Sequence, residues 1–219
     1  FAFLATRANT NLGVANRFYG LSPDGEHKIR GIALRRRDTP IFIANTQIMV
    51  LDILAKESDP TKLTDLLPEI LAVLQEQLAT LKAGEVPLEE LVVTQTLSRE
   101  PERYSVLSPS AVVARQLQAL GKSVKRGQHI KFIYIAPAPG VWAWDAPTLP
   151  NPKAIDRIKY RELLIRAVQE ILQPLGVAEV ILKNWLIGEA GYLAPPGIMN
   201  NNLNLPLFAN MKYLRLDIH

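Results

Sequence analysis

The sequence predicts an α+β fold, with short strands at the start of the chain and a mainly helical part after them. The first 40 or so residues contain short alternating runs around a turn motif, which is typical of a strand hairpin. Farther along, apolar residues return every three or four positions over long segments, the period of an amphipathic helix. Two more short strands are predicted among these helices.

The predicted hairpin begins with short strands at residues 1–4 and 16–21. Residues 22–25 are predicted to turn, because Pro23 presets φ and Gly25 accepts a positive φ. The returning strand is predicted at about 27–36, and one of its sides carries two basic residues and then two apolar ones: Lys28, Arg30, Ile32 and Leu34.

Two helices are predicted next. The first covers about 41–55, with an apolar stripe at Ile41, Ala44, Ile48, Leu51 and Ala55. The second has signals at both ends, since Asp59 is a good N-cap, Pro60 suits the first turn and Gly84 follows the last. Its expected buried stripe is Leu63, Leu67, Ile70, Leu74, Leu78 and Leu81.

The middle of the chain predicts a strand, a loop and a helix. Residues 91–97 alternate as a strand, and 98–103 are predicted as a charged loop. A helix is predicted to open at Ser108 and Pro109 and to close at Gly121.

The last third continues this pattern. A basic connector at 122–127 leads to a strand at 129–135, one face of which carries Ile130, Phe132 and Tyr134. Residues 136–152 are predicted as a loop. A long helix then ends at Gly176, with an apolar stripe at Ile155, Ile158, Leu164, Val168, Ile171 and Leu175. From about Trp185 irregular structure is predicted.

Composition excludes several classes of site. The chain has no cysteine, which removes disulfides, thiolate metal sites and cysteine nucleophiles. Its histidines, His27, His129 and His219, are scattered rather than spaced as metal ligands. It has no run of about 18 apolar residues and its start lacks a secretory signal, so a cytoplasmic protein without a membrane span is expected.

The net charge of +4 is concentrated at the start of the chain. Residues 1–45 hold the acids Asp24, Glu26 and Asp38 against a larger basic set: Arg7, Arg17, Lys28, Arg30, Arg35, Arg36 and Arg37. This local excess equals the net charge of the whole chain, so the remaining residues balance. Such an excess is typical of a surface that binds a polyanion.

The strongest candidate surface is Arg30 with the run Arg35, Arg36, Arg37 and Asp38. A guanidinium pairs with two phosphate oxygens at once, and Asp38 could hold one arginine in a fixed orientation. The alternative is a solvated, charged strand end. Three consecutive arginines on a strand would place charge on both faces, which favours phosphate contact.

Other candidates are weaker. Arg17 and Tyr19 would share one face of a strand and could both touch a phosphate or sugar, with a plain surface pair as an equal alternative. Trp142 and Trp144 could stack on a base, although a hydrophobic loop anchor is favoured. Gly121 and the two residues after it lack the earlier glycine of a phosphate-binding loop, so no nucleotide site is predicted there.

No convincing pair of catalytic carboxylates is visible in the sequence. Phosphoryl transfer on nucleic acids commonly uses two metal ions held by paired acids. Glu89 and Glu90 fall at a loop-to-strand junction and Asp52 at the edge of a helix stripe, and neither place suits Mg²⁺. Acids brought together only by folding, as in a metal-dependent nuclease, remain an alternative.

The order of these segments resembles the carboxy-terminal part of family B DNA polymerases. The resemblance extends over about residues 1–182 and is carried by segments 1–4, 13–20, 30–38 and 97–104 and the helix that follows. In that family a Lys-x-Tyr motif of the palm contacts primer-template DNA, and Arg17 to Tyr19 is similar to it. The family's arginine pair followed by aspartate touches the new duplex, and is similar to Arg36, Arg37 and Asp38.

The resemblance implies a domain division and a set of DNA contacts. Residues 1–40 would be the end of a polymerase palm, 41–184 the thumb, and 185–219 a tail of uncertain structure. The thumb departs from many relatives, with Ser105 in place of a lysine and Ser110 in place of a histidine. The predicted DNA-binding residues are Arg17, Tyr19, Arg30, Arg35, Arg36, Arg37, Ser98, Arg99, Tyr104, Ser108, Ser110, Arg115, Lys122 and Arg126.

The predicted function is to hold primer-template DNA as part of a DNA-directed DNA polymerase. The resemblance implies that the metal-binding aspartates precede the position of Phe1, so no catalytic residue, metal ligand or bound cofactor is predicted here. An amino-terminal exonuclease, palm and fingers portion would supply Mg²⁺, the nucleotide and the aspartates. The alternative is a free-standing module that binds DNA or RNA whatever its sequence.

Overall fold

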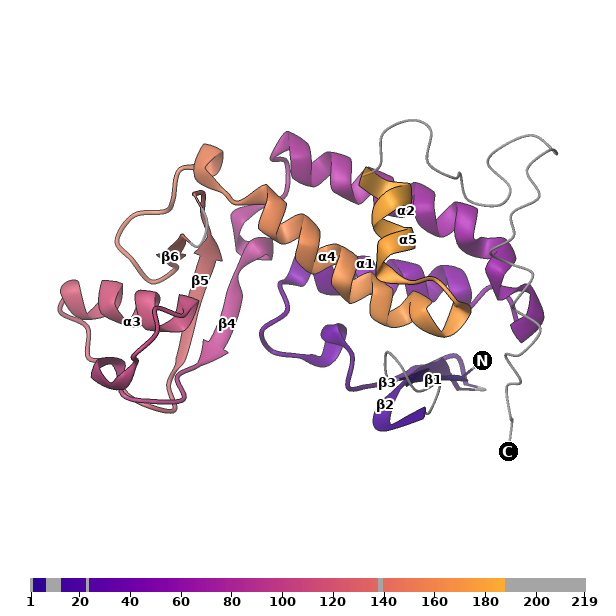
Figure 1. The fold of residues 1–219 in the computed structure, drawn as a ribbon, viewed down its shortest axis with the longest axis horizontal. Coiled ribbons are helices and arrows are strands. Elements are labelled where there is room, and N and C mark those ends of the chain that lie inside the picture. The colour runs from indigo at the N-terminus through magenta and orange to yellow at the C-terminus, as the bar shows by residue number, and fades with distance from the viewer. Residues whose placement is uncertain (1, 7–12, 23, 138–139, 188–219) are drawn as a thin grey trace. The chain divides into compact units, whose positions relative to one another are not determined.

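The computed structural model describes residues 2–6, 13–22, 24–137 and 140–187 (Figure 1). It contains helices and two three-stranded antiparallel sheets, which confirms the predicted α+β class. The described residues form two compact units. Of the described residues, unit 1 contains those within 2–32, 46–76 and 165–187, and unit 2 contains those within 33–45 and 77–164.

The sheet of unit 1 contains the predicted hairpin. Its strands are β1 (Ala2–Thr6), β2 (Gly13–Leu21) and β3 (His27–Arg30), paired in that order. The turn between β2 and β3 is closed by the Gly25 N–H, which donates to the Ser22 carbonyl at 2.9 Å, and Gly25 has φ +84°. Phe1 and Pro23, which took part in these predictions, lie outside the described residues.

The returning strand is shorter than predicted, because it ends at Arg30 and not near residue 36. Gly31 follows with φ +71°, and a Cβ built on it would lie 2.5 Å from the Asn16 carbonyl oxygen. Only glycine fits that backbone and that space. The chain leaves the sheet there, buries Ile32, and forms the 3₁₀ helix η1 (Ala33–Arg35). The three arginines therefore follow a turn and do not lie on a strand.

The predicted helix after this turn is α1 (Ile41–Leu54), but its buried side differs from the predicted stripe. Ile41 and Ile48 are 56% and 38% exposed. Gln47 is fully buried and its Nε2 donates to the Ala167 carbonyl at 2.5 Å. A polar residue on the buried side shifts the stripe, and apolar spacing alone could not reveal this.

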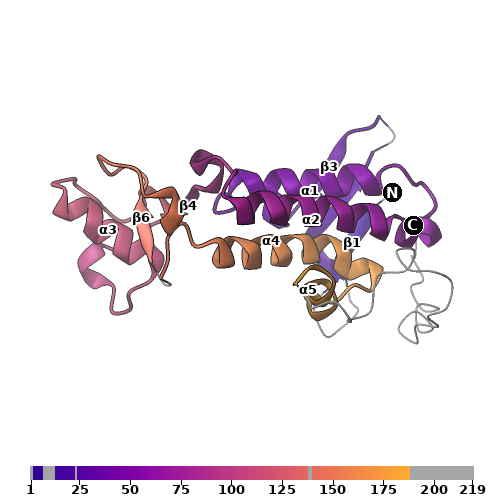
Figure 2. The same cartoon turned by 90° about the horizontal axis from the view of Figure 1, so that it is seen from above.

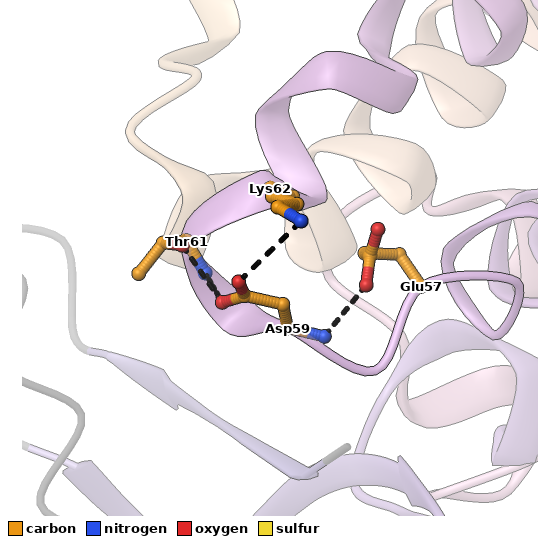
Figure 3. Close-up of polar contacts among 4 residues, drawn as sticks. All are labelled: Glu57, Asp59, Thr61 and Lys62. Carbon is orange, nitrogen blue, oxygen red and sulfur yellow. Dashed lines mark hydrogen bonds and ion pairs between the residues drawn. The ribbon is translucent and has the colours of Figure 1, made fainter.

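The second predicted helix forms as the 3₁₀ helix η2 (Pro60–Leu66) followed by α2 (Leu67–Ala83). Asp59 is the predicted N-cap, and its Oδ1 accepts from the Thr61 N–H at 2.9 Å and the Thr61 hydroxyl at 2.7 Å (Figure 3). Five of the six predicted stripe leucines and isoleucines are buried and Leu78 is half-buried. Gly84 ends the helix with φ +80°.

The long helix is α4 (Arg157–Leu172), continued by η6 (Gln173–Leu175) and ended by Gly176 with φ +83°. Its predicted stripe is buried except at Ile158, which is 61% exposed. The last described helix is α5 (Glu179–Ile187), and the predicted irregular tail beyond it lies outside the described residues.

Unit 2 contains the second sheet, β4 (Val93–Thr96), β5 (His129–Tyr134) and β6 (Val141–Ala143). Helix α3 (Pro109–Ala119) lies beside β5 and β6 (Figures 1 and 2). Strand β6 lies within residues 136–152, which were predicted as a loop. The prediction missed it because three residues are too few to show an alternating pattern. The Gln116 side chain ties α3 to β6, donating to the Val141 carbonyl and accepting from the Ala143 N–H, each at 2.8 Å.

The core of unit 2 lies between α3 and the sheet. Its members are mostly aliphatic residues from the strands and the helix: Val93, Leu97, Val113, Ala114, Leu117, Val124, Ile130, Phe132, Val141 and Ala143. Short 3₁₀ segments join the elements of this unit, namely η3 (Leu88–Leu91), η4 (Pro101–Arg103) and η5 (Pro152–Ala154). Within the described part of the chain, no helix is long and apolar enough to cross a membrane.

Candidate nucleic-acid interface

Four of the residues predicted to bind DNA meet at the start of α3 in unit 2. We call Ser98, Tyr104, Ser108 and Ser110 the hydroxyl cluster. The Tyr104 phenol oxygen accepts from the Ser98 N–H at 3.0 Å and from the Arg99 N–H at 3.3 Å. The Ser98 hydroxyl lies 3.3 Å from it. The loop after β4 is thus folded back onto Tyr104.

The serines of the cluster belong to the N-terminus of α3. Ser108 is the N-cap, and its hydroxyl oxygen accepts from the Ala111 N–H at 3.3 Å. The Ser110 hydroxyl lies 3.1 Å from that of Ser108. The prediction that Ser108 and Pro109 open a helix is confirmed. The Ser110 hydroxyl also contacts the Tyr104 phenol, so it links the cap to the tyrosine.

Hydrogen bonding changes the acidity of Tyr104. Partial burial raises the pKa of its phenol, but hydrogen bonds with Ser98, the backbone of Arg99 and Ser110 outweigh burial and hold the pKa below its usual value. Two backbone N–H groups occupy acceptor positions on the phenol oxygen, so its own hydrogen faces the hydroxyl groups of Ser98 and Ser110 within the cluster. With the serine hydroxyls and the exposed Arg99, the cluster offers donors of the kind that bind phosphate oxygens.

The arginine run is also in unit 2, where its members have different partners. The Arg36 Nε lies 3.7 Å from the Asp38 carboxylate, so the expected pairing forms, with both side chains 51% exposed. The Arg37 Nη1 lies 2.6 Å from Nε2 of His129, whose Nδ1 lies 2.8 Å from the Thr96 hydroxyl. Arginine can only donate, so Nε2 accepts and the Nδ1–H donates to Thr96.

The Arg17 and Tyr19 side chains of unit 1 share one face of β2, as predicted, but that face is turned to α4. An Arg17 guanidinium nitrogen lies 3.1 Å from the Glu170 carboxylate, and the Arg17 side chain is 29% exposed. Tyr19 is fully buried, and its hydroxyl donates to the Ile171 carbonyl. A fully buried side chain cannot contact DNA, so the prediction of Tyr19 as a DNA-binding residue is corrected.

The prediction that the arginine run lies on the returning strand with Arg30 is corrected too. Because β3 ends at Arg30, residues 35–37 do not extend the strand, and they belong to unit 2 while Arg17 and Arg30 belong to unit 1. Arg30 and Arg35 are exposed.

The other predicted contacts in unit 2 lie on its surface. Arg115, Lys122 and Arg126 are exposed, and the Lys122 ammonium donates to the Asp145 carbonyl. The Trp142 indole N–H donates to the Thr148 carbonyl at 2.9 Å, which fits the favoured interpretation of a loop anchor.

The described residues contain no group of three or more His, Asp or Glu side chains placed to hold a metal ion. Asp52, considered above as an acid at a helix edge, pairs with His27 at 2.8 Å in unit 1. No step through a metal is therefore assigned to these residues.

Comparison with known proteins identifies the family. A sequence model described as DNA polymerase family B matches residues 15–175. The chain belongs to this family. The match covers most of the predicted resemblance, including the arginine run and the hydroxyl cluster.

Archaeal polymerases are among the relatives of this family B chain. It is 26% identical to DNA polymerase 1 of Sulfolobus acidocaldarius over 167 residues, which cover 76% of the chain and 19% of that protein. It is 27% identical to a DNA polymerase of Thermococcus kodakarensis over 184 residues, or 81% of the chain and 11% of that protein. The chain thus spans about a fifth or less of these relatives.

A solved structure supports the fold. The family B DNA polymerase from the hyperthermophilic archaeon Pyrobaculum calidifontis matches with a TM-score of 0.58 and 23% identity, over 74% of this chain and 21% of that one. Sequence reasoning on this family B chain missed three partners: Glu170, His129 and Thr96. Glu170 contacts Arg17 and His129 contacts Arg37, while Thr96 contacts His129. The two residues of each pair lie far apart in the chain, so no local sequence pattern indicates these contacts.

Proposed function

We propose that this chain holds primer-template DNA by its sugar-phosphate backbone as a portion of a DNA-directed DNA polymerase. The observation that carries the proposal is the hydroxyl cluster, which lies in the part of the chain that matches the family. Its hydroxyl groups and the adjacent Arg99 bind phosphate oxygens without reading base sequence. Arg36 and Arg37 add charge on the same unit.

The proposed interface keeps the predicted residues that are exposed or have polar groups available. Residues 1–40 as palm edge and 41–184 as thumb remain predictions, as do the weaker contacts Arg17, Arg30, Arg35, Arg115, Lys122 and Arg126.

Another polymerase segment supplies Mg²⁺, the nucleotide and the catalytic aspartates. The proposed location is the cytoplasm, where a portion of a DNA polymerase would meet its DNA.

Fluorescence anisotropy on the 219-residue chain tests the proposal. We expect tighter binding to a primer-template junction than to a blunt duplex of equal length, with affinity falling as salt rises. The log–log slope changes by about −0.9 for each neutralised phosphate. Arg99→Gln should reduce the slope by roughly 1. Lys153→Gln, which removes an exposed cation of unit 2 outside the interface, is the matched control.

Two results would count against the proposal. Binding that is absent or independent of salt rejects a phosphate interface. Equal affinity for junction and blunt duplex supports the alternative of a free-standing nucleic-acid-binding module. Primer extension after joining the chain to a family B segment with catalytic aspartates then tests the polymerase role itself.

A further inference from the structure

Two apolar side chains are displayed beside the hydroxyl cluster. Val106 is 74% exposed and Leu107 is 60% exposed, and we call this pair the apolar tip. The tip lies in the loop between Tyr104 and Ser108, two members of the cluster. Large aliphatic side chains are more often buried than this.

The tip has a defined backbone. The Ser108 N–H donates to the Val106 carbonyl at 2.8 Å, which closes a three-residue turn with Leu107 at its centre. On one side the loop is held by the Tyr104 phenol bonded to the backbone of Ser98 and Arg99, and on the other by the N-cap of α3. The backbone that carries both exposed apolar side chains is therefore anchored on each side by members of the hydroxyl cluster.

We propose that the apolar tip packs against the deoxyribose rings of the duplex whose phosphates the hydroxyl cluster binds. This inference rests on the proposed function. Each backbone phosphate is joined to a sugar, so a surface that binds phosphates with hydroxyl groups lies against sugars between them. A deoxyribose presents C–H surface there, whereas a ribose adds a 2′-hydroxyl that Val106 and Leu107 offer no partner for. The tip thus favours DNA over RNA.

Three variants test this inference in the full chain. The double variant Val106→Ser with Leu107→Ser removes the apolar surface and leaves the charge unchanged. The double variant Val106→Ile with Leu107→Met keeps it apolar. Leu149→Ser is the matched control, since Leu149 is also 60% exposed in unit 2 but lies away in sequence from the cluster.

Anisotropy would be measured with a DNA duplex and an RNA duplex of the same sequence over a salt series. The serine variant should bind DNA about tenfold more weakly, as expected for losing two packed aliphatic groups. Its salt slope should equal that of the wild type, because no phosphate contact is lost. Its RNA affinity should change less than about twofold, since the tip makes no good ribose contact. The apolar variant and Leu149→Ser should bind both duplexes as the wild type does.

Unchanged DNA binding by the serine variant overturns the inference but leaves the proposed function intact. Equal losses for DNA and RNA also overturn it, because they show that the tip does not distinguish the sugars. If the wild type binds neither duplex with salt dependence, the proposed function fails as well. Thermal unfolding checks that the serine variant is folded, and the single variant Leu107→Asn gives a second, smaller change of the same sign.

Discussion

Tyr19 in unit 1 and Tyr104 in unit 2 were both predicted to contact DNA, and their environments are opposite. Tyr19 is fully buried, and its hydroxyl donates to a backbone carbonyl of α4. Tyr104 is partly exposed, and its oxygen accepts from two backbone N–H groups of its own loop. The same residue type thus stabilises packing in one unit and organises a hydroxyl-lined surface in the other.

Replacing Tyr19 should have the largest effect on stability. Tyr19→Ala removes a large buried ring and should lower the free energy of unfolding by about 3–5 kcal/mol. Tyr19→Phe keeps the ring but leaves the Ile171 carbonyl without this donor, at a cost of about 1–3 kcal/mol. Denaturant unfolding measures both.

The phenylalanine variant separates the two roles of Tyr19. If it lowers DNA affinity while stability is unchanged, Tyr19 contacts DNA and the contrast with Tyr104 is wrong. Tyr104→Phe in parallel should weaken DNA binding with stability altered by less than about 1 kcal/mol.

Gly31 is the next most sensitive position. Its φ of +71° and the 2.5 Å approach of a built Cβ to the Asn16 carbonyl oxygen leave no room for a side chain. Gly31→Ala should destabilise the protein by roughly 2 kcal/mol, because both the backbone and the neighbouring strand are strained. Gly25→Ala is a control in which φ is also positive but nothing lies within 4 Å of the Cβ. Equal losses for the two variants would show that the close approach is unimportant.

The pair of Arg17 and Glu170 tests whether unit 1 also contributes to DNA binding. Glu170→Gln removes the charge 3.1 Å from the Arg17 guanidinium, in a side chain that is only 10% exposed. We expect a loss of about 1–2 kcal/mol in unfolding free energy, less than for a fully buried pair. DNA affinity should rise slightly, because Arg17 is less neutralised. A fall in affinity would instead show that Glu170 positions Arg17 for DNA.

The accuracy of sequence reasoning depends on whether a feature is set by local chemistry or by contacts between distant segments, and both kinds occur in each unit. The N-cap at Asp59, the helix opened by Ser108 and the helix ends at Gly84 and Gly176 are set by local chemistry, and their prediction is confirmed. The end of β3 depends on the approach of Gly31 to Asn16, which lies on another strand.

Candidate site residues follow the same division. Ser98, Tyr104 and Ser108 are close in sequence, so their clustering follows from a loop and a helix cap. The inward orientation of Tyr19 depends on Ile171, far along the chain, and the partner of Arg37 is His129. Sequence spacing gives the residues that share a strand face, but the element that covers the face comes only from tertiary packing.

The smallest predicted effects are in the titration of the two phenols. Burial raises the pKa of Tyr19 far above its usual value, whereas hydrogen bonds hold that of Tyr104 below it despite partial burial. The contribution of Tyr19 to the free energy of unfolding is therefore fully present below the unfolded-state pKa of about 10, and it is lost as pH rises above that value. The contribution of Tyr104 to the free energy of unfolding is fully present above about pH 10, and it is lost as pH falls through the lower pKa of the folded state.

Each tyrosine-to-phenylalanine variant can be compared with the wild type by tyrosinate absorbance and by unfolding between about pH 8 and 11. The difference in absorbance between the wild type and Tyr104→Phe should show a phenol that ionises below about pH 10. The free energy of unfolding of the wild type, relative to that of Tyr104→Phe, should increase with pH. The difference in absorbance between the wild type and Tyr19→Phe should show no ionisation before the protein unfolds. The free energy of unfolding of the wild type, relative to that of Tyr19→Phe, should decrease with pH. If both differences in unfolding free energy change with pH in the same direction, one of the two tyrosines does not have the environment described. The absorbance differences then identify which one.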